Sequence, residues 1–206
     1  IPLVERPLYL EEYGNYVFVG VRQAGKSYLL YQRVQQLLAE GKLLEDIVYV
    51  NFDDERLQGM AATDFDLIIQ AYHSMYSGQP IFFFDEIQNV DGWANFARRL
   101  ANLKYRVYVT GSNAKMLSSE MATVLTGRYL QVEMLPFSLS ETMEWKGVVA
   151  KDSNDTLHAE ATVIADDYLR NGGYPETIDM RSITRSYLST LFDSIIWKDV
   201  AKRHNI

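Results

Sequence analysis

A glycine-rich segment near the start of the chain has the residue types that bind phosphate. The residues from Gly20 to Ser27 read GVRQAGKS and fit the pattern G-x-x-x-x-G-K-[ST], in which backbone N–H groups surround phosphate oxygens. Lys26 would neutralise the β- and γ-phosphates, and the Ser27 hydroxyl would ligate Mg²⁺. The alternative is a glycine turn beside a solvated lysine. The residues of this phosphate loop that we expect to bind a nucleotide are Gly20, Gln23, Ala24, Gly25, Lys26, Ser27 and the following Tyr28.

Two adjacent carboxylates follow an apolar run farther along the chain. Residues 81–84 read IFFF, and Asp85 and Glu86 come directly after them. Open α/β sheets bind ligands at the carboxyl ends of their strands, so this pair would lie beside the phosphate loop. We expect Asp85 to hold Mg²⁺ through its water shell and Glu86 to act as the base that activates water. The alternative is a pair of solvated carboxylates that cap the next helix.

Small polar residues follow the next apolar run. Residues 110–113 read TGSN, and the same rule would place them at the edge of the sheet near the γ-phosphate. Ser112 or Asn113 would then orient the attacking water. The alternative is that these residues only cap the following helix, which serine and asparagine do well. Both roles are compatible, and the residues alone leave the choice open.

Strand-like and helix-like segments alternate around these motifs. Apolar or β-branched runs at 16–20, 47–52, 81–84, 107–110 and 129–134 are separated by amphipathic segments, including 65–76 and 93–103. Such alternation indicates an α/β domain with a mainly parallel sheet that helices cover on both faces. After Pro136 only helical patterning remains. We therefore expect an ATPase-type core over residues 1–135 and a small helical lid over residues 136–206.

Composition narrows the function classes. The 206 residues are 48% hydrophobic and 23% charged, with a formal net charge of −7, which is ordinary for a globular protein. The acidic balance makes nucleic acid an uncertain partner and not the default one. There is no cysteine, the three histidines are too scattered to suggest a metal site, and no run is long enough to span a bilayer. We expect a cytoplasmic protein whose only metal is nucleotide-bound magnesium.

Taken together, these motifs resemble the prokaryotic AAA-superfamily ATPases. The branch is the one described as putative ATPases, in which an ATPase domain precedes a C-terminal domain of unknown function. The resemblance implies an ASCE-type sheet of five strands in the order 5-1-4-3-2, and a chain that corresponds to the N-terminal module. The segments that carry it are the phosphate loop, residues 83–90 with Trp93, residues 110–113, Gly127 with Arg128, residues 136–138 and residues 172–175.

The resemblance implies further roles for residues outside the motifs. Arg128 precedes the fifth strand, where AAA-like proteins carry an arginine that reaches the γ-phosphate of a neighbouring subunit, so we expect a homo-oligomer through Arg128. Tyr174 and Pro175 are similar to a lid element that contacts adenine. The alternatives are a surface arginine with an acidic neighbour and a plain turn between helices. A sensing arginine in the lid stays unassigned between Arg181 and Arg185.

The reaction that these residues favour is Mg²⁺-dependent hydrolysis of ATP, coupled to an unknown protein partner or to a missing C-terminal domain. A second hypothesis is an ATP/ADP-dependent switch with little or no hydrolysis. A phosphotransferase is less favoured, because Glu86 beside Asp85 would activate water and waste ATP. A GTPase is disfavoured because the sequence has no Asn-Lys-x-Asp motif for guanine.

Overall fold

The computed structural model describes residues 4–112, 124–148, 155–180 and 182–197, without the side chains of residues 155–157. The chain forms two compact units. The first comprises Leu8–Gly20 and Lys26–Glu133. The second comprises the described parts of Ile1–Pro7, Val21–Gly25 and Met134–Ile206. Each unit is described below by itself.

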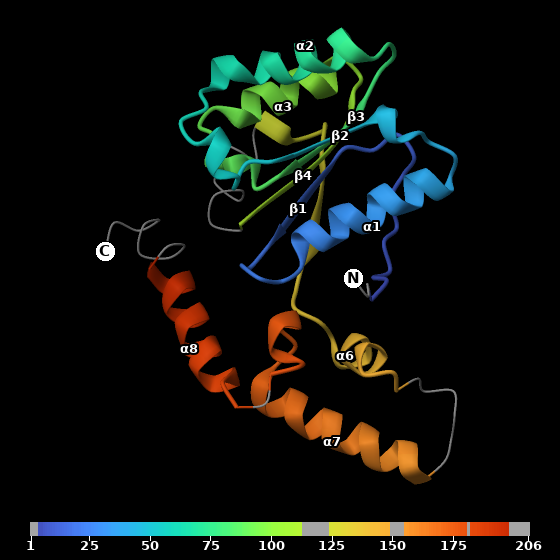
Figure 1. Ribbon diagram of the computed structural model, residues 1–206, viewed down its shortest axis with the longest axis vertical. Coiled ribbons are helices and arrows are strands. Elements are labelled where there is room, and N and C mark those ends of the chain that lie inside the picture. Colours follow the sequence, from blue (N-terminus) through green and yellow to red (C-terminus); the bar gives the residue numbers. More distant parts are fainter. Residues whose placement is uncertain (1–3, 113–123, 149–154, 181, 198–206) are drawn as a thin grey trace. The chain divides into compact units, whose positions relative to one another are not determined.

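The first unit is built on a five-stranded sheet (Figure 1). Its order is β2-β3-β4-β1-β5, which is the predicted order read from the other edge, so that prediction is confirmed. The pairs β2–β3, β3–β4 and β4–β1 are parallel. The strands are β1 (Tyr16–Gly20), β2 (Ile47–Asn51), β3 (Ile81–Asp85), β4 (Arg106–Ser112) and β5 (Leu130–Met134).

Helices cover both faces of this sheet, as Figure 1 shows. α1 (Lys26–Ala39) lies on one face, and α2 (Phe65–Met75) and α3 (Trp93–Asn102) lie on the other. Short 3₁₀ turns occur at η1 (Leu44–Asp46), η2 (Glu55–Leu57), η3 (Ala62–Asp64) and η4 (Ile87–Asn89). No helix in the described part of the chain is both long and apolar enough to cross a membrane.

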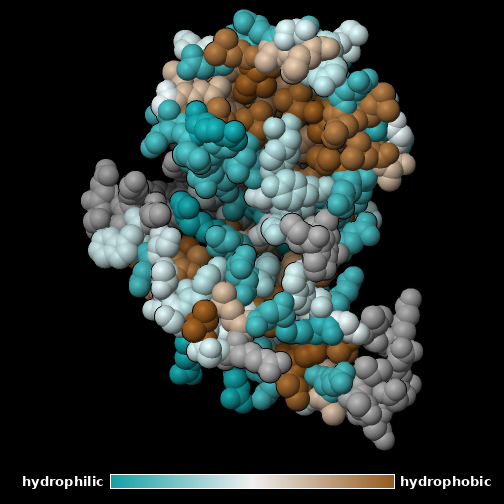
Figure 2. All heavy atoms as spheres, viewed as in Figure 1, coloured by the Kyte–Doolittle hydropathy of each residue, from teal (hydrophilic) through white to brown (hydrophobic). Residues whose placement is uncertain are grey.

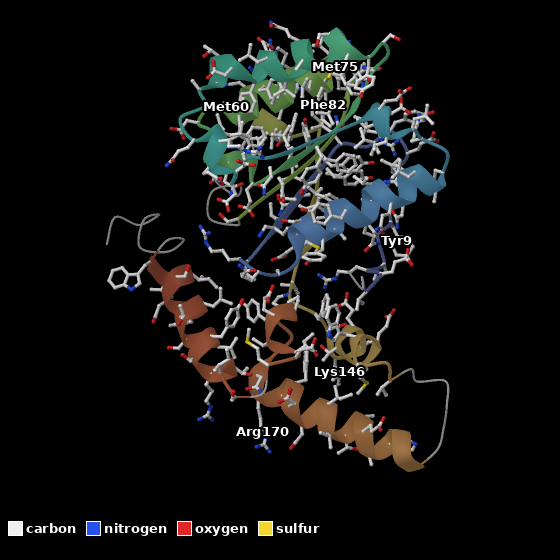
Figure 3. The ribbon with its side chains drawn as sticks, in the orientation of Figure 1. Tyr9, Met60, Met75, Phe82, Lys146 and Arg170 are labelled. Atoms are coloured by element: carbon white, nitrogen blue, oxygen red, sulfur yellow. The ribbon has the colours of Figure 1, made fainter. Side chains whose placement is uncertain are left out.

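Alternation along the strands divides the core into two layers, because successive side chains of a strand point to opposite faces. One layer joins Phe82, Phe84, Val107 and Val109 to α2 and α3 in a single hydrophobic cluster, and Phe82 lies beneath these helices in Figure 3. The other layer faces α1. It is aromatic, with near-parallel rings of Tyr16, Phe18, Phe83 and Tyr108 in contact.

The predicted helical stripes are correct in their centres and wrong at their ends. Leu103 was expected on the core face of its helix, but it lies just past the end of α3 and is 57% exposed. Met75 is 67% exposed at the last position of α2, and Tyr76 follows the helix. Hydrophobic side chains accordingly gather at the surface near the carboxyl end of α2 in Figure 2, where Figure 3 labels Met75.

The second unit contains the C-terminal helices. They are α6 (Leu139–Trp145), α7 (Asp155–Asn171), the turn η5 (Pro175–Thr177) and α8 (Thr184–Ile195). α6 begins with a capping box, in which the Ser138 hydroxyl accepts from the N–H of Glu141 and the Glu141 carboxylate accepts from the N–H of Ser138. This satisfies two backbone donors that a helix start leaves free. Lys146, labelled in Figure 3, forms an ion pair with Asp179 after η5.

An arginine from the N-terminal segment joins several parts of the second unit. Arg6 makes two hydrogen bonds to the carboxylate of Glu141, at 2.6 and 3.1 Å. It also donates to the carbonyl oxygens of Leu135 and Pro136 and, at 3.5 Å, to that of Ala24 in the phosphate loop. The guanidinium group suits this task because its donors form a planar fork. The N-terminal segment, the loop and the start of α6 are therefore held together through one side chain.

Candidate nucleotide site

The phosphate loop connects β1 to α1, which is the context that its sequence pattern requires. β1 ends at Gly20 and α1 begins at Lys26. Between them the backbone is left-handed at Gln23 (φ 61°) and at Gly25 (φ 92°). Glycine adopts such a conformation without strain, which explains why the pattern places Gly25 directly before the helix. Ala24 is buried and Gln23 is exposed.

Lys26 is not a solvated lysine. Its side chain is 5% exposed, its Nζ donates to the carbonyl oxygen of Gly20 at 3.3 Å, and it lies 3.8 Å from Oε1 of Glu86. A buried ammonium group is unfavourable unless an anion or an atom with lone pairs lies beside it. Lys26 has both partners, the Glu86 carboxylate and the Gly20 carbonyl oxygen. The glycine turn with a free lysine, which the sequence left open, does not describe this geometry.

The next two residues of α1 are more accessible. Ser27 is half-buried in the first turn of α1. Tyr28 is exposed, and its ring meets that of Tyr31 edge to face at 5.9 Å between centroids. Because N–H groups in the first turn of a helix have no partner inside the helix, this end of α1 offers donors and positive potential to an anion.

Asp85 ends β3 in a fully enclosed position. Asp85 is only 1% exposed. Hydroxyl groups from the two neighbouring strands donate to its carboxylate: Thr110 donates to Oδ1, and Tyr49 donates to Oδ2 at 2.9 Å. A carboxylate has about four lone-pair positions, so two remain for other donors such as metal-bound water. Burial, together with the charge of Asp85, raises the pKa of Tyr49 well above its ordinary value, and Tyr49 therefore acts as a donor.

Glu86 follows in a left-handed backbone conformation, with φ at 51° and ψ at 38°. Its N–H donates to the Thr110 hydroxyl at 2.9 Å, and its Oε2 accepts from Nε2 of Gln88. The next turn, η4, starts at Ile87, and the Glu86 side chain makes no capping hydrogen bond to it. The alternative role of these carboxylates as helix caps thus has no support at Glu86.

Ser112 ends β4 opposite Gly20 in the parallel register. It is 2% exposed, and its Oγ has no hydrogen-bond partner among the described residues. A buried hydroxyl without a partner is unfavourable, so this atom fits a ligand oxygen. Asn113 lies outside the described residues, and so does the start of any helix that Ser112 would cap.

Strand parity explains why these groups meet. Thr110 and Ser112 are in register with Phe18 and Gly20, and Asp85 is in register with Asn51. Residues two apart on a strand share a face of the sheet. The side of the sheet that faces α1, at the carboxyl ends of the strands, therefore carries Gly20, Ser112, Thr110 and Asp85. Lys26 and Glu86 join them through their own contacts.

The sequence reasoning missed two contributors, Tyr49 and Gln88, and it gave no role to Thr110, which it placed near the γ-phosphate. The alternation that places Asp85 on the α1 face also places Tyr49 and Thr110 there, and this signal could have identified both. Gln88 is in a one-turn segment without periodicity, so only the structure reveals that it holds Glu86.

Arg128 does not join this cluster within the chain. It precedes β5, whose first residue, Leu130, donates its N–H to the carbonyl of Asn15, just ahead of β1. Its Nε donates to Oδ1 of Asn102 at the end of α3. The contacts of Leu130 and Arg128 place Arg128 at the amino ends of the strands, away from Gly20 and Lys26 at their carboxyl ends. The Asn102 contact differs from the expected alternative, in which an acidic neighbour pairs with the arginine.

Tyr174 and Pro175 belong to the second unit, at the start of η5. Both are half-buried, and burial raises the pKa of Tyr174 above its ordinary value. The preceding Gly173 accepts a hydrogen bond from the N–H of Phe137 at 2.7 Å, and a Cβ at Gly173 would lie 1.9 Å from the Phe137 oxygen. Of the two lid arginines, Arg185 is exposed, and Arg181 lies outside the described residues.

Fold and site together define a P-loop nucleotide-binding α/β domain. A family model described as an AAA domain matches residues 13–143, which is more than half of the chain. This chain therefore belongs to the AAA domain family, as the resemblance in the sequence indicated.

Similar proteins give the family but no physiological role. The chain is 36% identical over 193 residues to the uncharacterized protein MJ1544 of Methanocaldococcus jannaschii, covering 92% of this chain and 42% of that protein. It is 35% identical over 193 residues to an uncharacterized protein of Haemophilus influenzae, covering 92% of this chain and 47% of that protein. The chain thus spans less than half the length of these relatives.

Two solved structures resemble the chain weakly. One is the Aeropyrum pernix ORC1 protein in complex with DNA, with a TM-score of 0.46 and 15% identity, covering 88% of this chain and 60% of that chain. The other is Hsp104 with ATPγS and FITC casein, with a TM-score of 0.49 and 15% identity, covering 80% of this chain and 32% of that chain. Neither likeness is close enough to indicate a function.

Proposed function

We propose that this chain binds Mg²⁺–ATP at the phosphate loop and hydrolyses the bond between the β- and γ-phosphates. The observation that supports this most is the convergence of Lys26, Asp85, Glu86 and Ser112 at one edge of the sheet. Lys26 supplies a buried cation for phosphate, and Asp85 supplies a carboxylate with lone pairs for metal-bound water. Glu86 supplies a partly exposed base for the attacking water, and Ser112 supplies a hydroxyl without a partner among the described residues for a γ-phosphate oxygen.

Each residue of the loop has a distinct task in this proposal. Backbone N–H groups from Gly20 to Ser27 surround the phosphates, with Gln23 and Ala24 contributing through the main chain. Lys26 transfers its contacts from Gly20 and Glu86 to the β- and γ-phosphates. Tyr28, next to Ser27 on α1, contacts the nucleotide from the exposed side of the helix.

Magnesium fits the groups that are present. The Ser27 hydroxyl would be a direct ligand and Asp85 would bind through metal-held water, a set of oxygen donors that suits Mg²⁺. When bound, the ion would neutralise negative charge that develops on the phosphates during cleavage.

Glu86 is the proposed general base. It would take a proton from a water molecule whose oxygen attacks the γ-phosphorus, while the bond to the β-phosphate oxygen breaks and ADP leaves. Gln88 holds one carboxylate oxygen of Glu86, and the other becomes available when Lys26 turns to phosphate. Ser112 and Asn113 would orient the water and the γ-phosphate.

A switch with slow hydrolysis is the second candidate, and one observation favours it. Glu86 is tied to both Lys26 and Gln88 in this structure, so a nucleotide must first rearrange these contacts before the base can act. If Glu86 stays restrained, ATP and ADP would select different conformations without fast turnover.

Other roles rest on the resemblance to AAA-superfamily ATPases. Arg128, at the amino ends of the strands, would reach the nucleotide of a second copy in a homo-oligomer. Tyr174 and Pro175 would contact adenine. Coupling to an unknown protein partner or to a further domain, and a cytoplasmic location, also remain proposals.

The experiment compares Glu86→Gln with wild type in single-turnover phosphate release at saturating Mg²⁺–ATP. Because glutamine keeps the shape but lacks basicity, we expect the rate to fall by about 10²–10⁴-fold, with ATP affinity retained. Glu55→Gln, which removes an exposed carboxylate of η2, serves as the matched control with an unchanged rate. Equal rates in wild type and Glu86→Gln would exclude Glu86 as the base. Binding without detectable release in wild type would favour the switch.

A further inference from the structure

Tyr49 contacts Asp85 from the edge strand of the sheet. It lies on β2 two residues before Asn51, which is the register partner of Asp85, so both side chains point to the α1 face. Diagonal neighbours of this kind are within reach of a long aromatic side chain. The Tyr49 hydroxyl donates to Oδ2 of Asp85 at 2.9 Å.

This contact leaves Asp85 little freedom. Thr110 donates to one carboxylate oxygen and Tyr49 to the other, so rotation of the carboxylate would break at least one hydrogen bond in a site that is 1% exposed. The remaining lone pairs of Asp85 are thereby fixed in direction. A carboxylate that binds a cation through water needs a fixed direction, because the water must contact both the ion and the carboxylate.

A second tyrosine extends the contact to the helix of the phosphate loop. The ring centroids of Tyr31 and Tyr49 lie 5.3 Å apart. On α1, Tyr31 is four residues after Ser27, and residues four apart share one face of a helix. The ring contact with Tyr31 thus joins the strand that carries Tyr49 to the face of α1 that carries Ser27.

From this chain of contacts we infer that Tyr49, supported by Tyr31, is a positioning residue for a divalent cation held between Ser27 and Asp85. The inference rests on the proposed Mg²⁺–ATP binding and deepens it. Tyr49 contacts neither the cation nor the nucleotide. It fixes the direction of the Asp85 carboxylate and, through Tyr31, ties the edge strand to the helix that carries Ser27.

Tyr49→Phe tests the inference, because it removes the hydroxyl and keeps the ring. The measurement is isothermal titration of a non-hydrolysable ATP analogue at a series of Mg²⁺ concentrations and in EDTA. Loss of a group that orients a metal ligand costs about 10–100-fold in metal affinity. Because Asp85 would act through water, we expect the low end of this range, which is about a tenfold rise in the Mg²⁺ concentration that gives half of the full increase in affinity for the analogue. Affinity in EDTA should stay within about twofold of wild type.

Tyr129→Phe is the matched control. The Tyr129 hydroxyl donates to the carbonyl of Ala97 at 2.8 Å, within the α3 layer on the opposite face of the sheet. Its loss removes a hydrogen bond of similar length, so it reproduces any general loosening of the fold without touching Asp85. We expect the Mg²⁺ dependence of Tyr129→Phe to equal that of wild type. In an Asp85→Asn background, Tyr49→Phe should cause no further change.

The outcomes separate the two levels of the account. An unchanged Mg²⁺ dependence in Tyr49→Phe would overturn the inference while leaving the proposed function intact. Equal shifts in Tyr49→Phe and Tyr129→Phe, or an equal loss in EDTA, would show a structural role and would also overturn it. Wild type that fails to bind the analogue at any Mg²⁺ concentration would refute the proposed function itself, and this inference with it.

Discussion

Thr110→Val removes the hydroxyl that connects the two carboxylate residues of the site. The Thr110 side chain is completely buried. Its hydroxyl donates to Oδ1 of Asp85 and accepts from the N–H of Glu86 at 2.9 Å. Valine has the same shape, so packing stays the same. The substitution leaves one carboxylate oxygen and one backbone N–H without a protein partner.

The expected loss of stability follows from these two contacts. A hydrogen bond to a charged group contributes about 1.5–3 kcal/mol, and a buried group left without a partner costs about 1–3 kcal/mol. Because Glu86 is partly exposed, water can reach its N–H, and the expected loss of stability lies toward the lower end of the two ranges added together. We expect the free energy of unfolding to fall by about 3 kcal/mol. In a domain of this size that lowers Tm by about 6–12 °C.

Urea unfolding followed by circular dichroism measures this change. Thr110→Ser keeps the hydroxyl and should recover most of the loss. Thr142→Val is the matched control: the Thr142 hydroxyl donates to the carbonyl of Ser138, which also accepts the N–H of Thr142, so its removal leaves no backbone group unpaired. A Thr110→Val protein within about 0.5 kcal/mol of wild type would refute the reasoning.

Two further predictions concern the second unit. Gly173→Ala should lower the free energy of unfolding by more than about 3 kcal/mol, because its Cβ would meet the Phe137 oxygen at 1.9 Å. Gly172→Ala is the control: its φ is 74° and the space around it is open, so it should lower the free energy of unfolding by only about 1–2 kcal/mol. Equal losses in the two variants would contradict the close contact at Gly173. Burial opposes ionisation of Glu141, but hydrogen bonds from Arg6 outweigh it and lower the pKa of Glu141. Its contribution is therefore complete above the ordinary glutamate pKa and is lost as pH falls through the lowered value. In urea unfolding, the free energy of unfolding of wild type should exceed that of Glu141→Gln at neutral pH, and this difference should shrink as the pH falls below the ordinary glutamate pKa. A difference that is constant with pH would contradict this prediction.

Most of the fold could be predicted because its signals are local. The glycine before Lys26 and the apolar strands with polar ends each determine a short segment, and alternation then assigns every strand side chain to a face. Helix ends were harder. Met75 and Leu103 continue an apolar spacing beyond the turns where α2 and α3 actually end, and nothing in the spacing shows that the helix has stopped.

The site could be predicted only as far as its motifs reach. Asp85 and Ser112 are fixed by their places at strand ends, and Lys26 by its place at the start of α1. Tyr49 was not foreseen, because the motifs mark only the ends of strands and Tyr49 lies in the middle of β2. Gln88 was not foreseen, because a single turn has no periodicity. Arg6 is separated from Glu141 by 135 positions in the sequence, and such a pair has no local signal at all.

Isothermal titration of Mg²⁺–ATP into wild type and Lys26→Ala tests the central claim most directly. Lys42→Ala, which removes an exposed lysine just after α1, is the control. Without Lys26 the phosphate charge is opposed only by backbone dipoles and Mg²⁺, so we expect wild type and Lys42→Ala to bind alike and Lys26→Ala to bind at least about a hundredfold more weakly, equivalent to about 2.7 kcal/mol. Lys26→Ala binding as tightly as wild type, or no binding by wild type, would contradict the assignment of this loop as a nucleotide site.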